Sequence, residues 1–288
     1  MSLSVHEIER LARDRFGEPN RGLSSRREMR FGRKGSVKVE MDGPKAGAWY
    51  DYEAASGGWL DGAMPEGYER QPSKPGTERA ESAEKFESVR RGSVSLDGTP
   101  GETYLRSRGI DRWPGHCVRW SPERHGILFL AAGADGYFKA GQIVYLTADG
   151  AKQHRADGVQ KRTLASVRRW HEIAAMRLPG AGEPVLCEGP ETALSIWVAH
   201  DCRRAVFACL GRAGLGALRV RNRRIVIARD GDDPGSTVDL SLTRAIADRS
   251  AIGQRVRVTD TPLGADFNDV LLRQGSAEVR RLIREAQS

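Results

Sequence analysis

Two stretches set the architecture of this chain: Val185-Leu186-Cys187-Glu188-Gly189 and Ile225-Val226-Ile227-Ala228-Arg229-Asp230-Gly231-Asp232. Each joins an apolar run, which predicts a buried strand, to an acidic residue followed by glycine. Between them, residues 190–199 have a helical pattern and residues 205–210 form another apolar run. Continuous apolar strands that alternate with helices predict an α/β fold with a largely parallel, buried sheet.

The same alternation continues toward the C-terminus. The pattern predicts a helix over 234–249, a strand over 255–258, and closing helices over 267–273 and 277–286. Ligands of such sheets bind at the carboxyl ends of the strands. Acidic residues follow two of those ends and recur in a third cluster after the last strand: Glu188, Asp230, Asp232, Asp266 and Asp269.

Carboxylates gathered at one sheet edge repel one another unless a cation lies between them. Oxygen ligands without nearby His or Cys favour Mg²⁺ or Mn²⁺, and such ions assist phosphoryl transfer. Taken singly, each acidic residue also fits a simpler interpretation. Glu188 could cap the following helix, the Asp230 stretch could be an acidic helix start, and Asp266 could cap its own first turn.

Composition narrows the class of protein. The chain has 288 residues and a formal net charge of +8, and 29% of its residues are charged. A basic surface favours polyanions such as nucleic acid, although the arginine excess also follows from a GC-rich genome. No apolar run is long enough to span a membrane, and the four cysteines form no C-x-x-C pair. We therefore expect a cytoplasmic protein without disulfides.

The upstream half predicts an α+β arrangement. Residues 3–16 have an amphipathic helical pattern, and residues 30–32, 36–41 and 48–52 alternate as in a small antiparallel ribbon. The Gly- and Pro-rich residues 62–77 predict a linker. Further elements are then expected: helices over 78–91 and 102–108, strands over 127–132 and 142–147, and a basic stretch over 160–164.

The order of a strand ending in Glu-Gly and a strand ending in Asp-x-Asp resembles the TOPRIM domain of bacterial-type primases, topoisomerases and repair nucleases. The resemblance covers residues 184–273. It implies that Glu188 lies at the reacting phosphodiester and that Asp230 and Asp232 hold a divalent metal ion, with Glu188 as a further ligand.

The stretch Leu186-Cys187-Glu188-Gly189-Pro190-Glu191-Thr192-Ala193-Leu194-Ser195 is most similar to the TOPRIM of phage and plasmid primases or primase-helicases. Residues 103–110, 127–130 and 141–145 resemble the segments of the primase core that precede it. The resemblance assigns phosphate and template contact to Lys161 and Arg162, and nucleotide or DNA contact to Asp266 and Asp269. The simpler interpretation of Lys161 and Arg162 is a solvated basic loop.

The N-terminal ribbon resembles the primase zinc finger, whose last two cysteines would fall near Asp51 and Ala54. No cysteine or histidine stands there or anywhere between His6 and His116, so no zinc is expected. A platform for single-stranded DNA could still form by stacking and charge. Its candidate residues are Arg30, Lys34, Trp49 and Tyr50. Alternatively, the aromatic residues form the small core of the ribbon.

These observations together favour a primase-like protein of a mobile element, which joins nucleoside triphosphates on single-stranded DNA. The expected domains are a metal-free ribbon (1–61), a linker with a charged helix (62–98), a primase-core subdomain (99–183) and a TOPRIM domain (184–288). The P-loop string is absent, so the resemblance implies a separate helicase partner. A metal-dependent TOPRIM nuclease and a non-catalytic DNA-binding accessory protein remain as alternatives.

Overall fold

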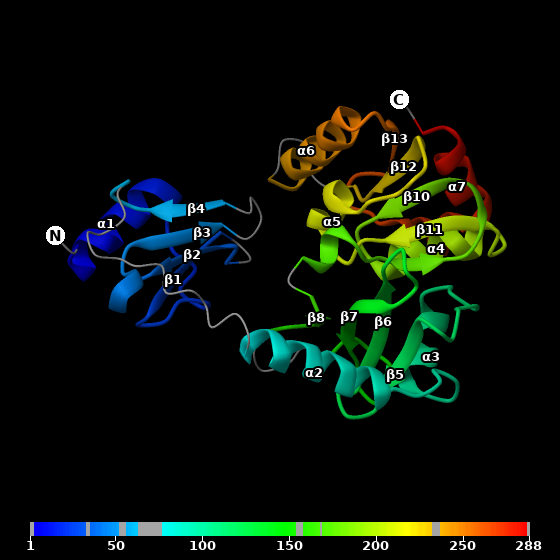
Figure 1. The fold of residues 1–288 in the computed structure, drawn as a ribbon, viewed down its shortest axis with the longest axis horizontal. Helices are drawn as coiled ribbons and strands as arrows, with labels where there is room; N and C mark the ends of the chain where they lie inside the picture. The colour runs from blue at the N-terminus through cyan, green and yellow to red at the C-terminus, as the bar shows by residue number, and fades with distance from the viewer. Residues whose placement is uncertain are drawn as a thin grey trace. The chain divides into compact units, whose positions relative to one another are not determined.

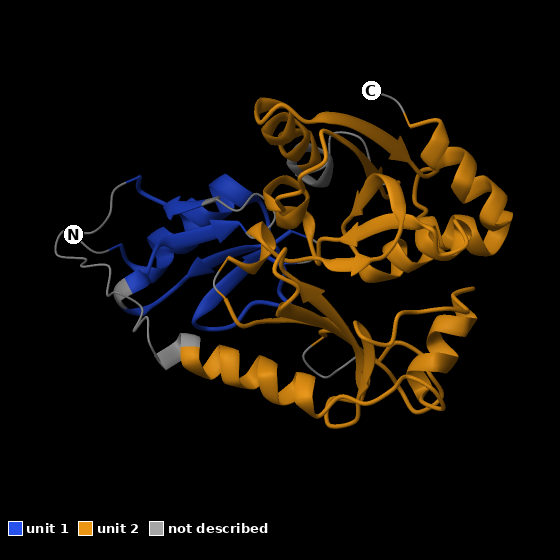
Figure 2. Cartoon of the chain, turned by 45° about the vertical axis from the view of Figure 1, so that its right-hand side comes forward, with its two compact units in different colours: residues 1–73 blue, residues 74–288 orange. Residues whose placement is uncertain are grey.

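The computed structural model describes residues 3–32, 35–51, 56–62, 77–153, 158–167, 169–231 and 237–286. The chain divides into two compact units, residues 1–73 and residues 74–288 (Figure 2). Each unit has its own hydrophobic core. The two units are therefore described separately.

The first unit is a four-stranded antiparallel sheet that packs against one helix (Figure 1). The helix α1 (Val5–Phe16) begins with a capping box between Ser4 and Glu7. Its residues Ile8 and Ala12 are buried against the sheet. The strands follow one another in space as in the chain: β1 (Glu28–Phe31), β2 (Val37–Glu40), β3 (Ala48–Asp51) and β4 (Ser56–Trp59), with a 3-10 turn η1 (Gly43–Lys45) before β3.

The second unit begins with an antiparallel sheet between two helices. Phe86 of the first helix lies beside Leu128 and Gly141 on one face, whereas Ile127 and Trp120 point to the other face and contact the second helix. The elements are α2 (Thr77–Arg91), α3 (Pro100–Ser107), β5 (Val118–Ser121), β6 (Gly126–Ala132), β7 (Phe138–Tyr145) and β8 (Lys161–Ala165). The strands lie in the order β5-β6-β7-β8.

A five-stranded sheet forms the rest of the second unit, in the order β13-β12-β10-β11-β9. All of its pairings are parallel except that of β9 with β11. Helices α4 and α7 pack on one face, and α5 and α6 pack on the other. The elements are η2 (Trp170–Glu172), β9 (Met176–Leu178), β10 (Ala181–Cys187), α4 (Pro190–Ala199), β11 (Arg204–Ala208), α5 (Arg212–Ala217), β12 (Arg224–Arg229), α6 (Thr237–Ala251), β13 (Arg255–Asp260) and α7 (Phe267–Arg284).

The architecture confirms the predicted fold class. The antiparallel ribbon, the α+β segment and the mostly parallel C-terminal sheet all form. Helix α7 covers the two helices predicted at the C-terminus and loses helical geometry at Gly275, whose φ is 81°. Strands β4, β5, β8 and β9 and helix α5 were not predicted from the sequence, because each is too short to produce a clear period.

One hydrophobic core spans both sheets of the second unit. It includes Phe129 of β6, Met176 of β9, Val185 of β10 and Phe267 of α7. Phe86 and Val89 of α2 belong to the same core, so the predicted charged helix is packed against the sheet. The expected subdomains 99–183 and 184–288 therefore share a single packed interior. In the parts of the chain that the structure describes, no helix combines the length and apolarity needed to cross a membrane.

Candidate active site

Glu188 and Asp230 lie at the carboxyl ends of two neighbouring parallel strands. β10 and β12 pair in parallel with Leu186 opposite Ile227, and each strand ends one or two residues later. Burial raises the pKa of the Cys187 thiol, and Cys209, Asp230 and Glu188 add to the effect. The strand register therefore places Glu188 and Asp230, two of the three predicted metal ligands, at the same edge of the sheet.

The third predicted ligand, Asp232, lies outside the described residues. Its predecessor Gly231 lies against the turn before α7: Gly231 N donates to Ala265 O over 2.8 Å, and Gly264 N donates to Gly231 O over 2.6 Å. A Cβ on Gly231 would lie 2.0 Å from Pro262 O, so no side chain fits there. The backbone between Asp230 and Asp232 is thereby held close to residues 262–265.

The oxygen donors that are described fit a hard divalent cation in kind, because both are carboxylates without a neighbouring His ligand. They do not complete a site by themselves. Among the residues that the structure describes, no group of three or more His, Cys, Asp or Glu side chains could hold a metal ion. Mg²⁺ is commonly held by one or two carboxylates together with waters and substrate phosphates, so the two carboxylates fit a partial ligand set.

Glu188 is held by an arginine from the next strand connection. Arg212, the first residue of α5, donates from Nε to a carboxylate oxygen of Glu188 over 3.0 Å. The backbone supports this contact, because Gly211 N donates to Glu188 O over 3.1 Å. The Glu188 and Arg212 side chains are 31% and 28% exposed, so both face a partly solvated edge. The sequence analysis did not single out Arg212.

A buried arginine fixes the segment that carries Arg212. Arg249 of α6 is fully buried and donates to Leu215 O, to Leu218 O over 2.7 Å and to the side chain of Gln254 over 2.7 Å. Gln254 in turn donates to two backbone oxygens of the segment that leads into β12. Each polar group therefore has a partner, which a buried guanidinium requires. This network holds α5 against α6.

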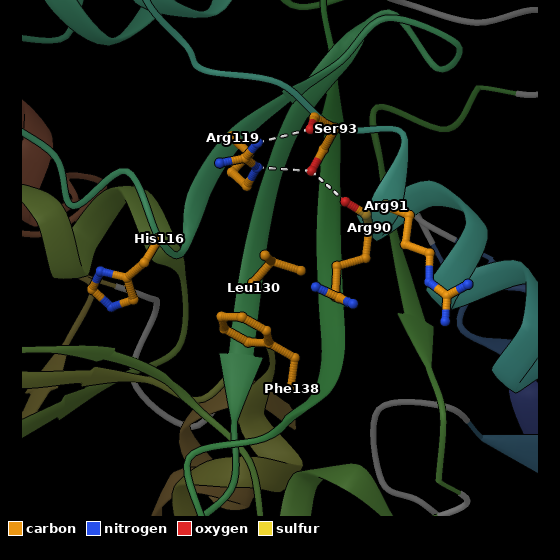
Figure 3. Close-up of a pocket in the computed structure, with 7 residues that line it drawn as sticks. All are labelled: Arg90, Arg91, Ser93, His116, Arg119, Leu130 and Phe138. Atoms are coloured by element: carbon orange, nitrogen blue, oxygen red, sulfur yellow. Dashed lines mark hydrogen bonds between the residues drawn. The ribbon is translucent and has the colours of Figure 1, made fainter.

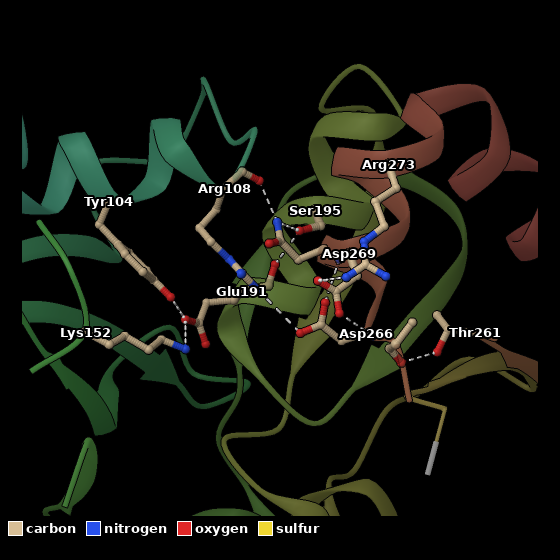
Figure 4. A network of polar contacts seen from close by, with 11 residues as sticks. Tyr104, Arg108, Lys152, Glu191, Ser195, Thr261, Asp266, Asp269 and Arg273 are labelled. Carbon is tan, nitrogen blue, oxygen red and sulfur yellow. Dashed lines mark hydrogen bonds and ion pairs between the residues drawn. The ribbon is translucent and has the colours of Figure 1, made fainter. Parts of the chain in front are cut away.

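Asp266 and Asp269 form the cap of α7 (Figure 4). The Asp266 carboxylate accepts from Asp269 N over 2.8 Å, and the Asp269 carboxylate accepts from Asp266 N over 3.2 Å. Asp266 also pairs with Arg108 over 3.6 Å, and Asp269 with Arg273 over 3.9 Å. The geometry therefore gives both residues a capping role, which was the simpler of the two interpretations.

A second carboxylate of the Glu188 motif lies on the opposite side of the strand end. Glu191, in the first turn of α4, accepts from the Tyr104 hydroxyl and pairs with Lys152 over 2.9 Å (Figure 4). Burial alone would raise the pKa of Glu191, but Lys152, Tyr104 and Lys161 lower it below its usual value. Burial and Glu191 raise the pKa of Tyr104, so the hydroxyl stays a donor.

This network also locates the predicted basic motif. Lys161 lies close enough to Glu191 for its charge to act on the carboxylate, whereas Arg162 is the next residue along β8 and points to the other face of the sheet. Both residues are exposed. Lys161 therefore lies near the Glu188 motif, and Arg162 faces elsewhere. Tyr104, Lys152 and Glu191 were not predicted as functional residues, and their local signal is the acidic residue directly after Pro190.

A pocket of about 220 Å³ lies between the end of α2 and the β5–β7 sheet (Figure 3). Its arginines already have partners in the protein: Arg90 and Arg91 pair with Glu87, and Arg119 donates to Ser93. None of the predicted site residues lines it. The pocket is therefore not part of the candidate site.

The ribbon of the first unit separates the two aromatic residues proposed for DNA stacking. Trp49 and Tyr50 are consecutive in β3 and so point to opposite faces. Trp49 packs against Phe16 at 5.3 Å between ring centroids, with the Arg15 guanidinium 4.4 Å from its ring centroid. Tyr50 is 42% exposed. A single platform with both rings does not form, and Trp49 belongs to the core of the ribbon.

Acidic neighbours accompany the cations on the outer face of this ribbon. Arg30 pairs with Glu28 over 2.9 Å, and Lys38 pairs with Glu28 over 3.0 Å and with Glu40 over 2.8 Å. Lys34 lies outside the described residues. The pairing reduces the net positive charge that this face offers to a nucleic acid.

Residues 184–277 match the family model of the Toprim domain, and residues 80–172 match that of a domain of unknown function, DUF7146. No curated protein matches the sequence. Among solved structures, the Aquifex aeolicus primase with its zinc-binding and RNA polymerase domains is 15% identical with a TM-score of 0.52, and the match covers 99% of this chain and 86% of that chain.

Two structures of primase cores are similar to a large part of this chain. The DnaG primase catalytic domain bound to ssDNA is 11% identical with a TM-score of 0.51, and the DnaG catalytic core is 12% identical with a TM-score of 0.50. Each match covers 73% of this chain and 80% of the other. The chain therefore contains a Toprim domain, and its mixed α/β fold is similar to that of DnaG primases.

Proposed function

We propose that this protein synthesises short primers on single-stranded DNA from nucleoside triphosphates, in a reaction that requires Mg²⁺ or Mn²⁺. The observation that carries the proposal is the position of Glu188 and Asp230 at neighbouring strand ends of a Toprim domain. That edge is where parallel sheets bind their ligands. The primase-like fold of the whole chain supports polymerisation over other reactions of the Toprim domain.

The proposed metal ligands are Glu188, Asp230 and Asp232. When bound, the ion would polarise the phosphate and stabilise the attacking and leaving oxygens of nucleotidyl transfer. Lys161 and Arg162 are proposed to contact the phosphates of nucleotide and template, for which exposed cations are suited. The ribbon of the first unit is proposed to have lost its zinc, because it lacks Cys and His ligands.

The biological setting is also a proposal. The Glu188-Gly189-Pro190-Glu191-Thr192-Ala193-Leu194 string is similar to Toprim sequences of phage and plasmid primases, which supports a role in the replication of a mobile element. A replicative helicase is the proposed partner, because the same string resembles that of primase-helicases. The cytoplasm is the compartment in which such replication takes place.

A priming assay on circular single-stranded DNA tests the reaction. Labelled oligonucleotides should appear only with all four nucleoside triphosphates and with Mg²⁺ or Mn²⁺. The Asp230→Ala plus Asp232→Ala variant should lose the product by a factor of about 10² or more, as expected for loss of charge stabilisation at the reacting phosphate. The matched control is Asp111→Ala plus Glu123→Ala, which removes two carboxylates that are both 63% exposed.

Equal product from the wild type and from the Asp230/Asp232 variant would refute the enzymatic assignment. Metal-dependent loss of labelled DNA without added nucleotides would show a nuclease instead. Binding of DNA without either reaction would show an accessory protein. Lys161→Ala plus Arg162→Ala should then weaken DNA binding and reduce the salt slope by about 0.7 per lost phosphate contact. The control variant Arg244→Ala plus Arg273→Ala removes the same charge from exposed positions of α6 and α7.

A further inference from the structure

Arg212 forms an ion pair with Glu188, whose carboxylate is one of the proposed metal ligands. Its Nε lies 3.0 Å from a carboxylate oxygen of Glu188. The two residues come from neighbouring strand connections, since Glu188 follows β10 and Arg212 follows β11. A guanidinium neutralises one of the acidic charges that would otherwise repel each other at this edge. Arg212 is therefore the cation that the structure pairs with Glu188.

A dication on Glu188 would weaken this contact. The hydrogen bond uses one carboxylate oxygen, and a metal ion on the other oxygen would repel the guanidinium across the same carboxylate. Arg212 is then held less strongly and can take another partner. The Arg212 guanidinium, once it leaves Glu188, can bind the oxygens of a nearby phosphate, because guanidinium groups bind phosphate oxygens well.

The surroundings let the Arg212 side chain move while its backbone stays fixed. The side chain is 28% exposed, and within the described ranges Glu188 is the acidic group with which it pairs. The backbone of α5, in contrast, is held by Arg249 through Leu215 O and Leu218 O. A long flexible side chain on a fixed helix can change partners without any rearrangement of the sheet.

We propose that Arg212 is an exchangeable counter-ion: it neutralises Glu188 in the metal-free protein and transfers to the phosphates of the incoming nucleotide when a divalent cation takes Glu188. This inference rests on the proposed function. It makes Arg212 a residue that opposes metal binding on its own and supports binding of a metal–nucleotide pair. The ligand class is a nucleoside triphosphate, whose phosphates carry the charge that Arg212 would follow.

Direct binding of Mn²⁺, measured from the free-ion signal in electron paramagnetic resonance, tests the exchange without any need for activity. Arg212→Gln removes the charge and keeps a polar, though shorter, side chain. It should bind Mn²⁺ about threefold to tenfold more tightly than the wild type, as expected for loss of a competing partly exposed ion pair. With a non-hydrolysable nucleoside triphosphate present, the same variant should bind the nucleotide about threefold to tenfold more weakly.

Arg280→Ala is the matched control, because Arg280 pairs with Asp201 over 3.3 Å before the start of β11, at the other end of the sheet. It should alter neither affinity. Arg212→Lys restores the charge and should return Mn²⁺ affinity toward the wild-type value. Far-ultraviolet circular dichroism and thermal melting confirm that each variant is folded.

The outcomes separate the two proposals. Wild-type protein that binds Mn²⁺, with both affinities unchanged in Arg212→Gln, overturns the exchange and leaves the metal site intact. Tighter Mn²⁺ binding without weaker nucleotide binding overturns the transfer to phosphate. Wild-type protein that binds no Mn²⁺ overturns the proposed metal site, and the exchange with it.

Discussion

Within residues 266–269, Asn268 is the residue whose replacement should lower the free energy of unfolding most. Its side chain is fully buried, and its amide donates to Arg108 O over 2.6 Å and to Ser195 Oγ over 2.9 Å. These contacts join α7 to the end of α3 and to α4. Asn268→Ala removes both hydrogen bonds and leaves a buried carbonyl oxygen without this donor. With about 1 kcal/mol for each bond and a similar cost for the unmet acceptor, we expect a loss of about 2–4 kcal/mol.

Urea denaturation followed by circular dichroism measures this loss, and thermal melting should show a fall of about 5–10 °C for a unit of this size. Asn222→Ala is the control, because Asn222 is exposed, and it should change the free energy of unfolding by less than about 0.5 kcal/mol. Ser195→Ala adds a second test. Because Ser195 accepts from Asn268, the double variant should be destabilised by less than the sum of the single variants. An Asn268→Ala variant as stable as the wild type, or fully additive effects, would refute this account of the junction.

Three further predictions concern the buried charges. Lys152→Met removes the cation that pairs with Glu191 and so raises the pKa of Glu191. The folded variant should lose about 1–3 kcal/mol of stability at pH 8, and the loss should shrink at pH 5 because the folded variant takes up a proton as the pH falls. An equal loss at both pH values in urea denaturation would contradict this. Burial and neighbouring arginines lower the pKa of His200 from 6.5 to about 4. The unfolded chain therefore binds the proton first, so wild-type stability should fall by roughly 1–3 kcal/mol from pH 6.5 to pH 4, and His200→Gln should remove that part of the slope in denaturation curves. Arg249→Lys keeps the charge but cannot donate to the same three acceptors in the same geometry, so it should lower the free energy of unfolding by about 2–4 kcal/mol. An unchanged urea midpoint would show that the planar guanidinium is not needed.

The elements that the sequence predicts best are those with one strong local signal. The apolar runs of β10 and β12 and the glycine break in α7 are visible in consecutive residues. The placement of Glu188 and Asp230 at one edge follows from the same runs, because parallel strands end at a common edge. For Trp49 and Tyr50 the sequence held a signal that the predicted platform did not use. They are neighbours in a strand, and the period of two places such neighbours on opposite faces.

Contacts made by the fold itself have no such local signal. Tyr104 and Glu191 are 87 positions apart, and Asn268 and Arg108 are 160 apart. The packing of the two sheets determines which side chains contact a buried carboxylate. A local sequence pattern does not show this packing. Arg212 is a further example, since its partner Glu188 belongs to another strand connection. The Asp266–Asp269 spacing, in contrast, is a capping-box pattern that fits the observed cap and needs no ligand.

The two acidic residues of the Glu188 motif face different partners, and this arrangement ties the halves of the second unit together. Glu188 turns toward α5 and the strand-end edge, whereas Glu191, three residues later, binds groups from α3 and from the loop after β7. Lys161 of β8 lies within electrostatic reach of Glu191. One turn of α4 therefore fixes the separation between the strand-end carboxylates and the basic strand. The proposed reaction needs such a fixed distance, because the metal ligands and Lys161 must act on the same nucleotide.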